Sequence, residues 1–172
     1  HNNGTERIYE AYKKISKSKK FDLVIDIQGD EPLISPYHID KVITHHIKNY
    51  QNDIVLPTIN SDQKNNTNVI KVVNNIRNEV MYLSRTNIPF EFRNNTKYIK
   101  KHLSIISFKP DALHKFSINE KTPLEKIEDI ELLRALEIGL KIKTFNLKGD
   151  SFSVDVLDDF KRAKKKMILD KV

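Results

Sequence analysis

The chain has 172 residues, of which 38% are hydrophobic and 31% are charged. Charges interrupt every apolar run after a few residues, which excludes a transmembrane helix, and the apolar content excludes a fully disordered chain. The absence of cysteine excludes disulfides and thiolate metal sites. Residues 1–4 contain no apolar core of a signal peptide. We therefore expect one globular domain over residues 1–172, located in the cytoplasm and without a membrane partner.

The formal net charge of +7 comes from 30 Lys and Arg against 23 Asp and Glu. Such a surplus raises the question of a nucleic acid or another polyanionic partner. Six of the cations are Arg, whereas proteins that read phosphates usually rely on Arg. The basic run at 161–166 lies on a predicted helix, where a solvated face is the simpler interpretation. We therefore expect no nucleic-acid partner and keep a Lys-rich nucleic-acid or anionic-surface binding module as the alternative class.

The first elements in the chain are a predicted helix and a predicted strand. Residues 5–16 form an amphipathic helical pattern behind Thr5, a candidate N-cap. The apolar face of this helix comprises Ile8, Tyr12 and Ile15. Residues 21–27 are mostly apolar, which is typical of a buried strand, and the Gly/Pro loop at 28–32 ends it.

A second helix is predicted to begin at Ser35-Pro36, because Ser is a favoured N-cap and Pro a favoured first helical residue. One stripe of this helix carries Ile39, Val42, Ile43 and Ile47. Residues 53–59 and 69–73 predict two strands separated by a polar, Asn-rich loop. A strand, a helix of about a dozen residues and another strand indicate a right-handed crossover in a largely parallel sheet.

The second half predicts strands over 80–90 and 102–108, with a polar segment at 91–101 between them. Thr122-Pro123-Leu124-Glu125 matches a capping box with Pro at the first helical position, and its helix is expected to end at Gly139. The remaining elements are a short strand over 142–147 and a closing helix over 157–169. The order of elements predicts an α/β layer architecture.

Two acidic residues follow predicted strands. Asp30 follows the first strand, and Asp155 follows the last one after a short loop. In open α/β sheets the ligand cleft lies beyond the carboxyl ends of the strands. Two carboxylates at one edge suit Mg²⁺, which takes few protein ligands and completes its shell with substrate phosphates and water. The alternative is that Gly29-Asp30 is only a turn and that Asp155 caps the last helix.

Eight segments of the chain carry a family resemblance. They are, in order, residues 3–7 (NGTER), 26–33 (DIQGDEPL), 71–73 (KVV), 82–89 (YLSRTNIP), 102–105 (HLSI), 123–128 (PLEKIE), 131–134 (ELLR) and 154–155 (VD). In this order and spacing they resemble the 3-deoxy-manno-octulosonate cytidylyltransferases, or CMP-Kdo synthetases, over nearly the whole chain. The resemblance implies a Rossmann-like α/β/α sandwich with a mostly parallel mixed sheet, of the nucleotide-diphospho-sugar transferase type.

The resemblance also implies a single cytidylyltransferase domain over residues 1–172 that lacks the N-terminal nucleotide-binding unit of the family. The implied reaction transfers CMP from CTP to the anomeric hydroxyl of 3-deoxy-manno-octulosonate (Kdo) or a close relative. It releases pyrophosphate, requires Mg²⁺ and serves lipopolysaccharide or capsule biosynthesis. A homodimer paired through residues 80–105 is implied as well. A cytidylyltransferase for another sugar acid is the alternative enzyme.

The same resemblance assigns roles to individual residues. Asp30 and Asp155 are implied to be the catalytic metal ligands. The residues implied to bind the nucleotide are Gly4, Thr5, Arg7 and Gln28. The residues implied to bind the sugar acid, or to support the loops around it, are Gln28, Arg85, His102 and Glu131.

Three of these residues have a structural alternative. Arg85 could pair with a surface acid, and His102 could be a hydrogen-bonded structural histidine. Glu131 and Arg134 are three residues apart on a predicted helix, so an exposed ion pair between them is a sufficient explanation.

The acceptor pocket implied by the resemblance is altered in this chain. Ile106 and Leu132 replace a Tyr and a Gln that contact the sugar in the family. An unpaired buried hydroxyl costs about 1 to 3 kcal/mol, so we hypothesise that Kdo is a poorer substrate than a relative with a changed tail. Asp26 in place of the usual Asn and Ser153 in place of the usual Gly leave the acids of the metal motifs unchanged.

Overall fold

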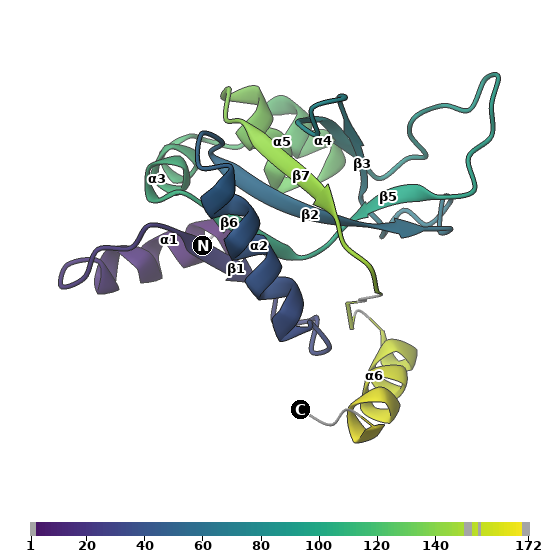
Figure 1. Ribbon diagram of the computed structural model, residues 1–172, viewed down its shortest axis with the longest axis horizontal. Helices are drawn as coiled ribbons and strands as arrows, with labels where there is room; N and C mark the ends of the chain where they lie inside the picture. Colours follow the sequence, from purple (N-terminus) through teal and green to yellow (C-terminus); the bar gives the residue numbers. More distant parts are fainter. Residues whose placement is uncertain (1–2, 150–152, 155, 170–172) are drawn as a thin grey trace.

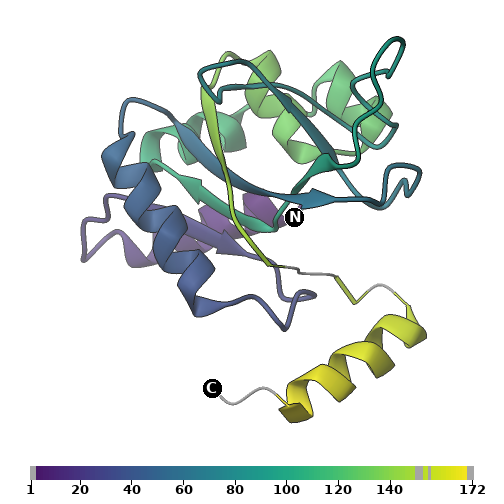
Figure 2. The ribbon, with the colours of Figure 1, turned by 45° about the vertical axis from the view of Figure 1, so that its right-hand side comes forward.

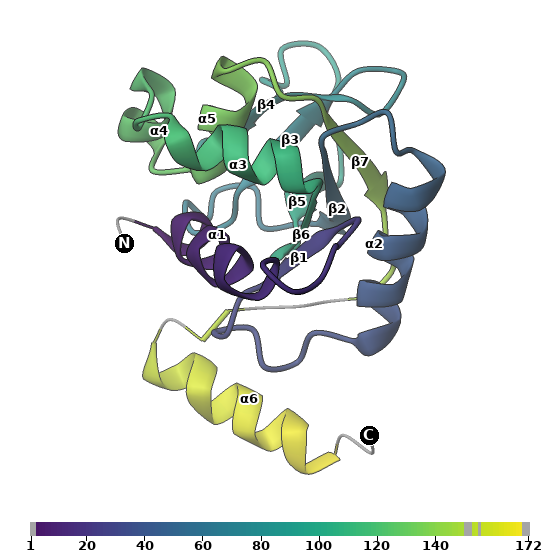
Figure 3. The same ribbon diagram turned by 90° about the vertical axis from the view of Figure 1, so that its left-hand side faces the viewer.

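The computed structural model describes residues 3–149, 153–154 and 156–169. Within these residues, helices cover both faces of one seven-stranded sheet (Figures 1 and 3). Helices α1 (Gly4–Ile15) and α3 (Pro110–Ile118) lie on one face, and α2 (Pro36–Lys48) lies on the other. The predicted α/β/α sandwich is therefore confirmed.

The sheet is mixed. Its strands are β1 (Val24–Ile27), β2 (Ile54–Ser61), β3 (Lys71–Asn74), β4 (Val80–Ser84), β5 (Ile99–His102), β6 (Ile105–Phe108) and β7 (Ile142–Asn146). β1 and β2 run in the same direction, as a crossover through α2 requires, but β6 lies between them and pairs antiparallel with both. β7 pairs parallel with β2. The other ladders of the described residues are antiparallel, so the expected mostly parallel pairing is wrong in this detail.

The single strand expected over 102–108 is interrupted. β5 ends at His102 and β6 begins at Ile105. β5 pairs with the end of β2 and with β3, whereas β6 pairs with the start of β2 and with β1. The sheet therefore divides at Leu103–Ser104, which we call the sheet fork.

The main hydrophobic core lies between the sheet and the helices α3 and α5 (Glu131–Glu137). Large fully buried side chains such as Phe108, Phe116 and Leu133 fill it. Ile106 and Leu132, the two positions that differ from the family's acceptor pocket, are also buried in this core. Both side chains are therefore packed among apolar residues of the core.

The N-cap of the first helix lies two residues before the expected cap. Asn3 is the N-cap of α1, and its Oδ1 accepts a hydrogen bond from the backbone N–H of Glu6 at 2.8 Å. Thr5 lies inside the helix and is buried. The N-cap prediction for Thr5 is therefore wrong, because Asn3 supplies the acceptor that the free N–H groups need.

The second helix begins at Pro36, as predicted, but it buries a different face. His38, Val42 and His46 are buried, whereas Ile47 is 60% exposed. The His46 ring accepts from the Ser107 hydroxyl at Nδ1 (2.7 Å) and donates from Nε2 to a backbone carbonyl (3.2 Å). Hydrogen-bonded histidine rings thus take part of the buried face that the sequence assigned to isoleucines.

The helix expected over 123–139 is two helices, α4 (Pro123–Glu128) and α5. Asp129 breaks it with a left-handed backbone, at φ +51°. The Thr122 side chain makes no capping bond, and Glu125 is buried against Arg134 instead of reaching back to the helix start. The capping-box prediction is therefore wrong, while Gly139 ends α5 with a φ of +79°, as expected.

The closing helix α6 (Leu157–Leu169) has the predicted bounds and lies beyond the edge of the sheet (Figures 1 and 2). The charged residues of the run at 161–166 are exposed, as predicted, and Ala163 is buried. α3 lies in a stretch for which the sequence predicts no element. No helix in the described part of the chain has the length and apolar character needed to span a membrane.

Candidate active site

Four of the predicted site residues meet at the carboxyl end of β1. Gln28 follows β1, and its backbone N–H donates to the Ser104 carbonyl of the sheet fork at 3.4 Å. The Gln28 amide packs beside Gly4, where a Cβ would lie 3.7 Å from Nε2. Thr5 and Glu131 contact each other next to this pair. α1, β1 and α5 thus meet around Gln28.

Glu131 anchors the N-terminus of α1. Its carboxylate accepts bonds from the N–H groups of Gly4 (3.2 Å) and Thr5 (3.3 Å) and from the Thr5 hydroxyl (2.5 Å). A carboxylate at this end also complements the helix dipole. The alternative of an exposed ion pair with Arg134 is wrong, because Arg134 is fully buried and pairs with Glu125.

Asp26 is a buried carboxyl group in β1 beside this cluster. The Nε2 group of Gln28 donates to both of its oxygens, at 2.9 and 3.1 Å. Burial and the Glu131 carboxylate raise the pKa of Asp26 to about 6, and the Gln28 bond opposes this shift. Sequence reasoning assigned Asp26 no role, although an acid inside a predicted buried strand is a signal in itself.

Asp30 lies in an exposed turn after β1, so the turn interpretation of Gly29-Asp30 also holds. Its backbone carbonyl accepts from the Val154 N–H at 2.8 Å. The segment just before Asp155 therefore meets the Asp30 turn, while Asp155 itself lies outside the described residues. The described residues hold no group of three or more His, Cys, Asp or Glu arranged for a metal ion.

A cavity of about 710 Å³ separates the Asp30 turn from α6. Its lining is largely apolar and includes Pro32, Val154, Phe160, Met167 and Ile168. Lys164 is the basic residue among its lining residues, facing the same cavity as Asp30. The lining thus combines apolar side chains with one acid and one base, a mixture that is common in ligand sites.

His102 ends β5 at the sheet fork. Its Nδ1 donates to the Leu103 carbonyl at 2.7 Å, because a carbonyl only accepts, and the neutral ring keeps Nε2 as an acceptor. Burial lowers the pKa of His102, with Glu31 opposing and Arg85 reinforcing the shift. Glu31 is itself buried and accepts from the Ser104 hydroxyl at 2.5 Å. His102 is therefore both hydrogen-bonded within the fold and available at Nε2.

Arg85 follows β4 and is held by backbone carbonyls rather than by a surface acid, so that alternative is wrong. The partners of its guanidinium are the carbonyls of Glu128 (2.8 Å from Nε), Asp129 (2.9 Å from Nη2) and Thr67 (3.2 Å from Nη1). Each Nη thus keeps one N–H for another acceptor. The buried ammonium of Lys71 donates to the Arg85 carbonyl at 2.6 Å and fixes the backbone below it.

Arg7 stands apart from these residues. It is exposed on α1 and makes no ion pair with the described part of the chain. The structure therefore brings Gly4, Thr5, Gln28 and Glu131 together. It places Asp30 and Arg85 on loops and His102 at the end of β5, and it leaves Arg7 exposed on the first turn of α1.

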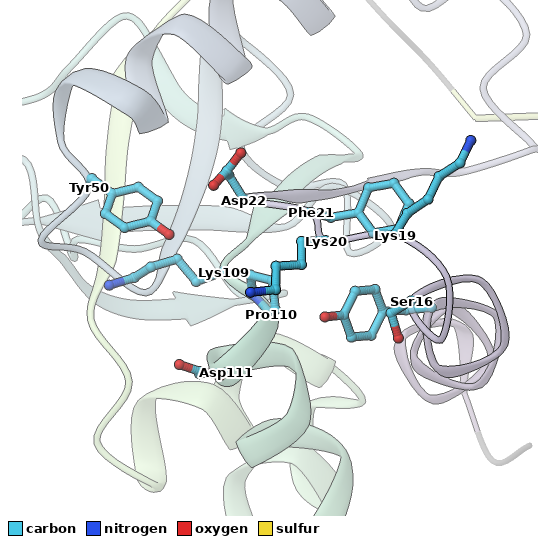
Figure 4. A pocket seen from close by; sticks show the side chains of 10 residues that line it. Ser16, Lys19, Lys20, Phe21, Asp22, Tyr50, Lys109, Pro110 and Asp111 are labelled. Carbon is cyan, nitrogen blue, oxygen red and sulfur yellow. The ribbon is translucent and has the colours of Figure 1, made fainter.

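A second cavity, of about 470 Å³, lies near the other end of β1, where this strand begins (Figure 4). The Lys109 ammonium lies 5.0 Å from the centre of the Tyr50 ring within it. Its lining carries both signs of charge, with Lys19, Lys20 and Lys109 against Asp22 and Asp111. No residue with a predicted site role lines this cavity, so the candidate site is at the Gln28 edge.

A comparison with protein families matches residues 1–142 to the family described as cytidylyltransferase. Curated relatives are also similar. The 3-deoxy-manno-octulosonate cytidylyltransferase of Rickettsia rickettsii (strain Sheila Smith) is 38% identical over 165 residues, which cover 94% of this chain and 66% of the relative. The enzyme of that name from a Nitratiruptor species is 35% identical, covering 94% and 69%. The chain thus spans about two thirds of the length of such relatives.

Solved structures also resemble the chain. One is described as CMP:2-keto-3-deoxy-manno-octonic acid synthetase complexed with CTP, with a TM-score of 0.90 and 25% identity, covering 98% of this chain and 69% of that one. Another, HddC from Yersinia pseudotuberculosis, has a TM-score of 0.66 at 14% identity and shares the fold.

Proposed function

Because this chain belongs to the cytidylyltransferase family, we propose that its protein transfers CMP from CTP to the anomeric hydroxyl of Kdo or a close relative and releases pyrophosphate. The relatives named for this activity and the similarity to a synthetase bound to CTP support the proposal. The product would serve lipopolysaccharide or capsule assembly. A cytoplasmic location stays a prediction.

The observation that carries the proposal is the set of hydrogen-bonding groups at the sheet fork. The Nε2 atom of His102 and the Oε1 atom of Gln28 are acceptors without a partner among the described residues. The Arg85 guanidinium keeps one N–H on each Nη atom, which suits a two-point bond to a carboxylate. Atoms that accept hydrogen bonds from hydroxyl groups, beside an Arg that can bind a carboxylate, suit an acid with several hydroxyl groups.

The reaction forms a bond between the anomeric oxygen and the α-phosphorus of CTP and breaks the bond from that phosphorus to the leaving pyrophosphate oxygen. Such transfers depend on positioning and on neutralisation of charge rather than on a covalent protein nucleophile. Arg85, His102 and Gln28 would orient the sugar acid. The exposed Arg7, beside the N-terminus of α1, would contact the phosphates.

Asp30 would hold Mg²⁺ together with Asp155. The donor chemistry fits, since the Asp30 carboxylate makes no bond to the described residues and the chain next to Asp155 is tied to the Asp30 turn. Bound Mg²⁺ supplies charge neutralisation for the triphosphate. Gly4 and Thr5 would shape the nucleotide side indirectly, because Glu131 already takes their N–H groups.

We also propose that the protein forms a homodimer through the segment around residues 80–105. Large apolar side chains are exposed there, and a second copy is the partner implied by the family resemblance. They include Met81 (62% exposed), Phe90 (82%), Phe92 (80%) and Tyr98 (46%). Burial of these side chains against a second copy would remove their apolar surface from water.

Ile106 and Leu132 concern the choice of the sugar acid that accepts CMP. Both are buried in the main core and offer no hydrogen bond, so a preference for a sugar acid with an altered tail stays a prediction that rests on the family resemblance. Comparing kcat/KM for Kdo with that for amino- and deoxy-substituted octulosonic acids tests this preference. A preference for Kdo that Ile106→Tyr with Leu132→Gln leaves unchanged would exclude a role for these two positions.

Pyrophosphate release from CTP in the presence of Kdo, measured on the complete protein, tests the proposed activity. We expect release that depends on both substrates and on Mg²⁺. Retention on heparin or DNA that collapses with salt, without any pyrophosphate release from CTP and a panel of sugar acids, would favour the Lys-rich binding module instead.

A further inference from the structure

Asp26 is a buried acid whose hydrogen bonds the proposed reaction does not use. It is 2% exposed and lies in β1 opposite Ile106 of β6, whose side chain has no donor. A buried carboxylate needs donors, and among the described residues its donor is the Gln28 amide. The Asp26 side chain therefore acts on its surroundings chiefly through Gln28.

The Asp26 carboxylate fixes which end of the Gln28 amide faces the protein. An ionised carboxylate only accepts hydrogen bonds, so the Nε2 end must face Asp26 and the Oε1 end must face away. Gly4 packs against the same amide, with room for a Cβ at 3.7 Å from Nε2 and 3.9 Å from Oε1. Oε1 accepts no hydrogen bond from the described residues, so it is an acceptor with a fixed direction.

We propose that Asp26 is a positioning residue for the acceptor substrate, because it turns the Gln28 carbonyl oxygen toward the site, where it takes a hydrogen bond from a substrate hydroxyl. The inference rests on the proposed function, in which Gln28 contacts the sugar acid. The inference goes beyond that function because it selects a substrate that presents a hydroxyl donor, and not an ether or carbonyl acceptor, to Gln28.

Asp26 also makes this contact sensitive to pH. The groups that face it are the Gln28 amide, the uncharged Ile106 of β6 and the Glu131 carboxylate of α5. Burial and Glu131 raise the pKa of Asp26 to about 6. Once protonated, Asp26 has an O–H that can donate to Oε1 of Gln28. The Gln28 amide can then flip, so that Nε2 instead of Oε1 faces away from Asp26. Substrate binding should therefore weaken as the pH falls through about 6.

Steady-state kinetics of the complete protein test the proposal. Asp26→Asn keeps the size of the side chain but offers both a donor and an acceptor, so Gln28 loses its single orientation. We expect KM for the sugar acid to rise about tenfold, the value of one hydrogen bond to a fixed acceptor, with kcat within about twofold. We also expect the rise of the wild-type KM below pH 6 to disappear. Asp40→Asn, an exposed acid on α2, is the matched control and should change neither.

A double-mutant cycle separates action through Gln28 from a general structural effect. In the Gln28→Ala background, Asp26→Asn should change KM by less than about twofold. Effects of the two substitutions that multiply, or a KM that keeps its pH dependence in Asp26→Asn, would overturn the proposal.

Nuclear magnetic resonance of the side-chain amide of Gln28 in the wild-type complete protein gives a readout that needs no activity. Its resonances should shift with a midpoint near pH 6. Unchanged resonances between pH 5 and 8 would overturn the proposal even if the protein transfers CMP. Absence of CMP transfer to any sugar acid, together with the expected titration, would instead reject the proposed function and leave the Asp26–Gln28 pairing intact.

Discussion

Arg134 and Glu125 form a buried, two-point ion pair. The Nε and Nη2 atoms of Arg134 donate to the two carboxylate oxygens of Glu125 at 2.6 Å each, and both side chains are nearly or fully buried. Arg134 also donates from Nη1 to the Asn119 carbonyl at 3.0 Å, and its guanidinium lies over the Phe116 ring. One side chain of α5 thereby holds α4 and the end of α3 in place below the site.

Replacing Arg134 with Met should strongly destabilise the fold. The Glu125 carboxylate would remain buried without a partner, which costs about 3 to 5 kcal/mol. Urea denaturation at pH 7 measures the change. The control is Arg77→Met, which removes an exposed pair with Glu79 and should leave stability nearly unchanged. Arg134→Met/Glu125→Leu should recover most of the loss, and an unaltered Arg134→Met variant would show that the pair does not stabilise the fold.

Replacing Asp26 with Asn should stabilise the protein at neutral pH. The pKa of Asp26 rises from 3.8 to about 6 on folding, so the folded state binds a proton more tightly than the unfolded state. The contribution of this group to stability is therefore present below about pH 4 and is lost as the pH rises through 6. Because Asn does not ionise, its advantage should grow over this range to at most about 3 kcal/mol.

The measurement is urea denaturation of the wild type and Asp26→Asn at several pH values between 4 and 7.5. Asp40→Asn is again the control for loss of a carboxylate at the surface. A stability difference that stays constant across this range would mean that Asp26 titrates at its ordinary pKa. Together with the kinetic effect expected above, this substitution should gain stability while it loses affinity for the sugar acid.

Replacing Asp30 with Asn should lower kcat for CMP transfer by about two orders of magnitude and leave the fold intact, because the exposed carboxylate makes no bond within the described chain. Pyrophosphate release as a function of Mg²⁺ concentration measures this loss. Asp22→Asn, near the start of β1 and at the other end of this strand from Asp30, is the control and should keep wild-type turnover. Near-normal turnover of Asp30→Asn at ordinary Mg²⁺ would remove Asp30 from the proposed metal site.

Replacing Phe92 with Asp should dissociate the proposed homodimer. Phe92 is 80% exposed, and a charge there would have to be buried in the interface at a cost. Sedimentation velocity of the complete protein measures the shift from dimer to monomer. Tyr37→Asp, at another exposed aromatic position on α2, is the control. If the wild type is a monomer, or if Phe92→Asp remains a dimer, this segment is not the interface.

Periodicity and local signals predicted much of the fold. The amphipathic patterns located α1 and α6, Pro36 marked the start of α2, and Gly139 marked the end of α5. These features depend on backbone preferences and on burial of one face, which nearby residues determine. They could therefore be predicted without knowledge of the tertiary contacts.

The features that could not be predicted depend on partners far apart in the sequence. Glu125 matches a capping box, but Arg134 outcompetes the helix N-terminus for its carboxylate. The face of α2 is set by Ser107, which hydrogen-bonds His46 across 61 residues. Side chains that find a buried partner elsewhere override the local pattern.

The candidate site shows the same division. The positions of Gln28 and Asp30 after β1 could be predicted from the strand pattern, and the family resemblance gave site roles to Gly4, Thr5 and Glu131. The bonds between them were not predictable, since Glu131 caps α1 from 126 residues away. Asp155 lies outside the described residues, so its metal role stays a prediction.

The sheet fork has a consequence for how acceptor preference can change over evolution. Gln28 and Asp30 follow β1 on one branch of the sheet, whereas Arg85 follows β4 on the other, and the ladders of both branches run through β2. Substitutions that repack the β3–β4 branch leave the hydrogen bonds between β1 and β6 intact. Under the proposed function, the contact of Arg85 with the sugar acid can therefore change on one branch while the contact of Gln28 is kept on the other.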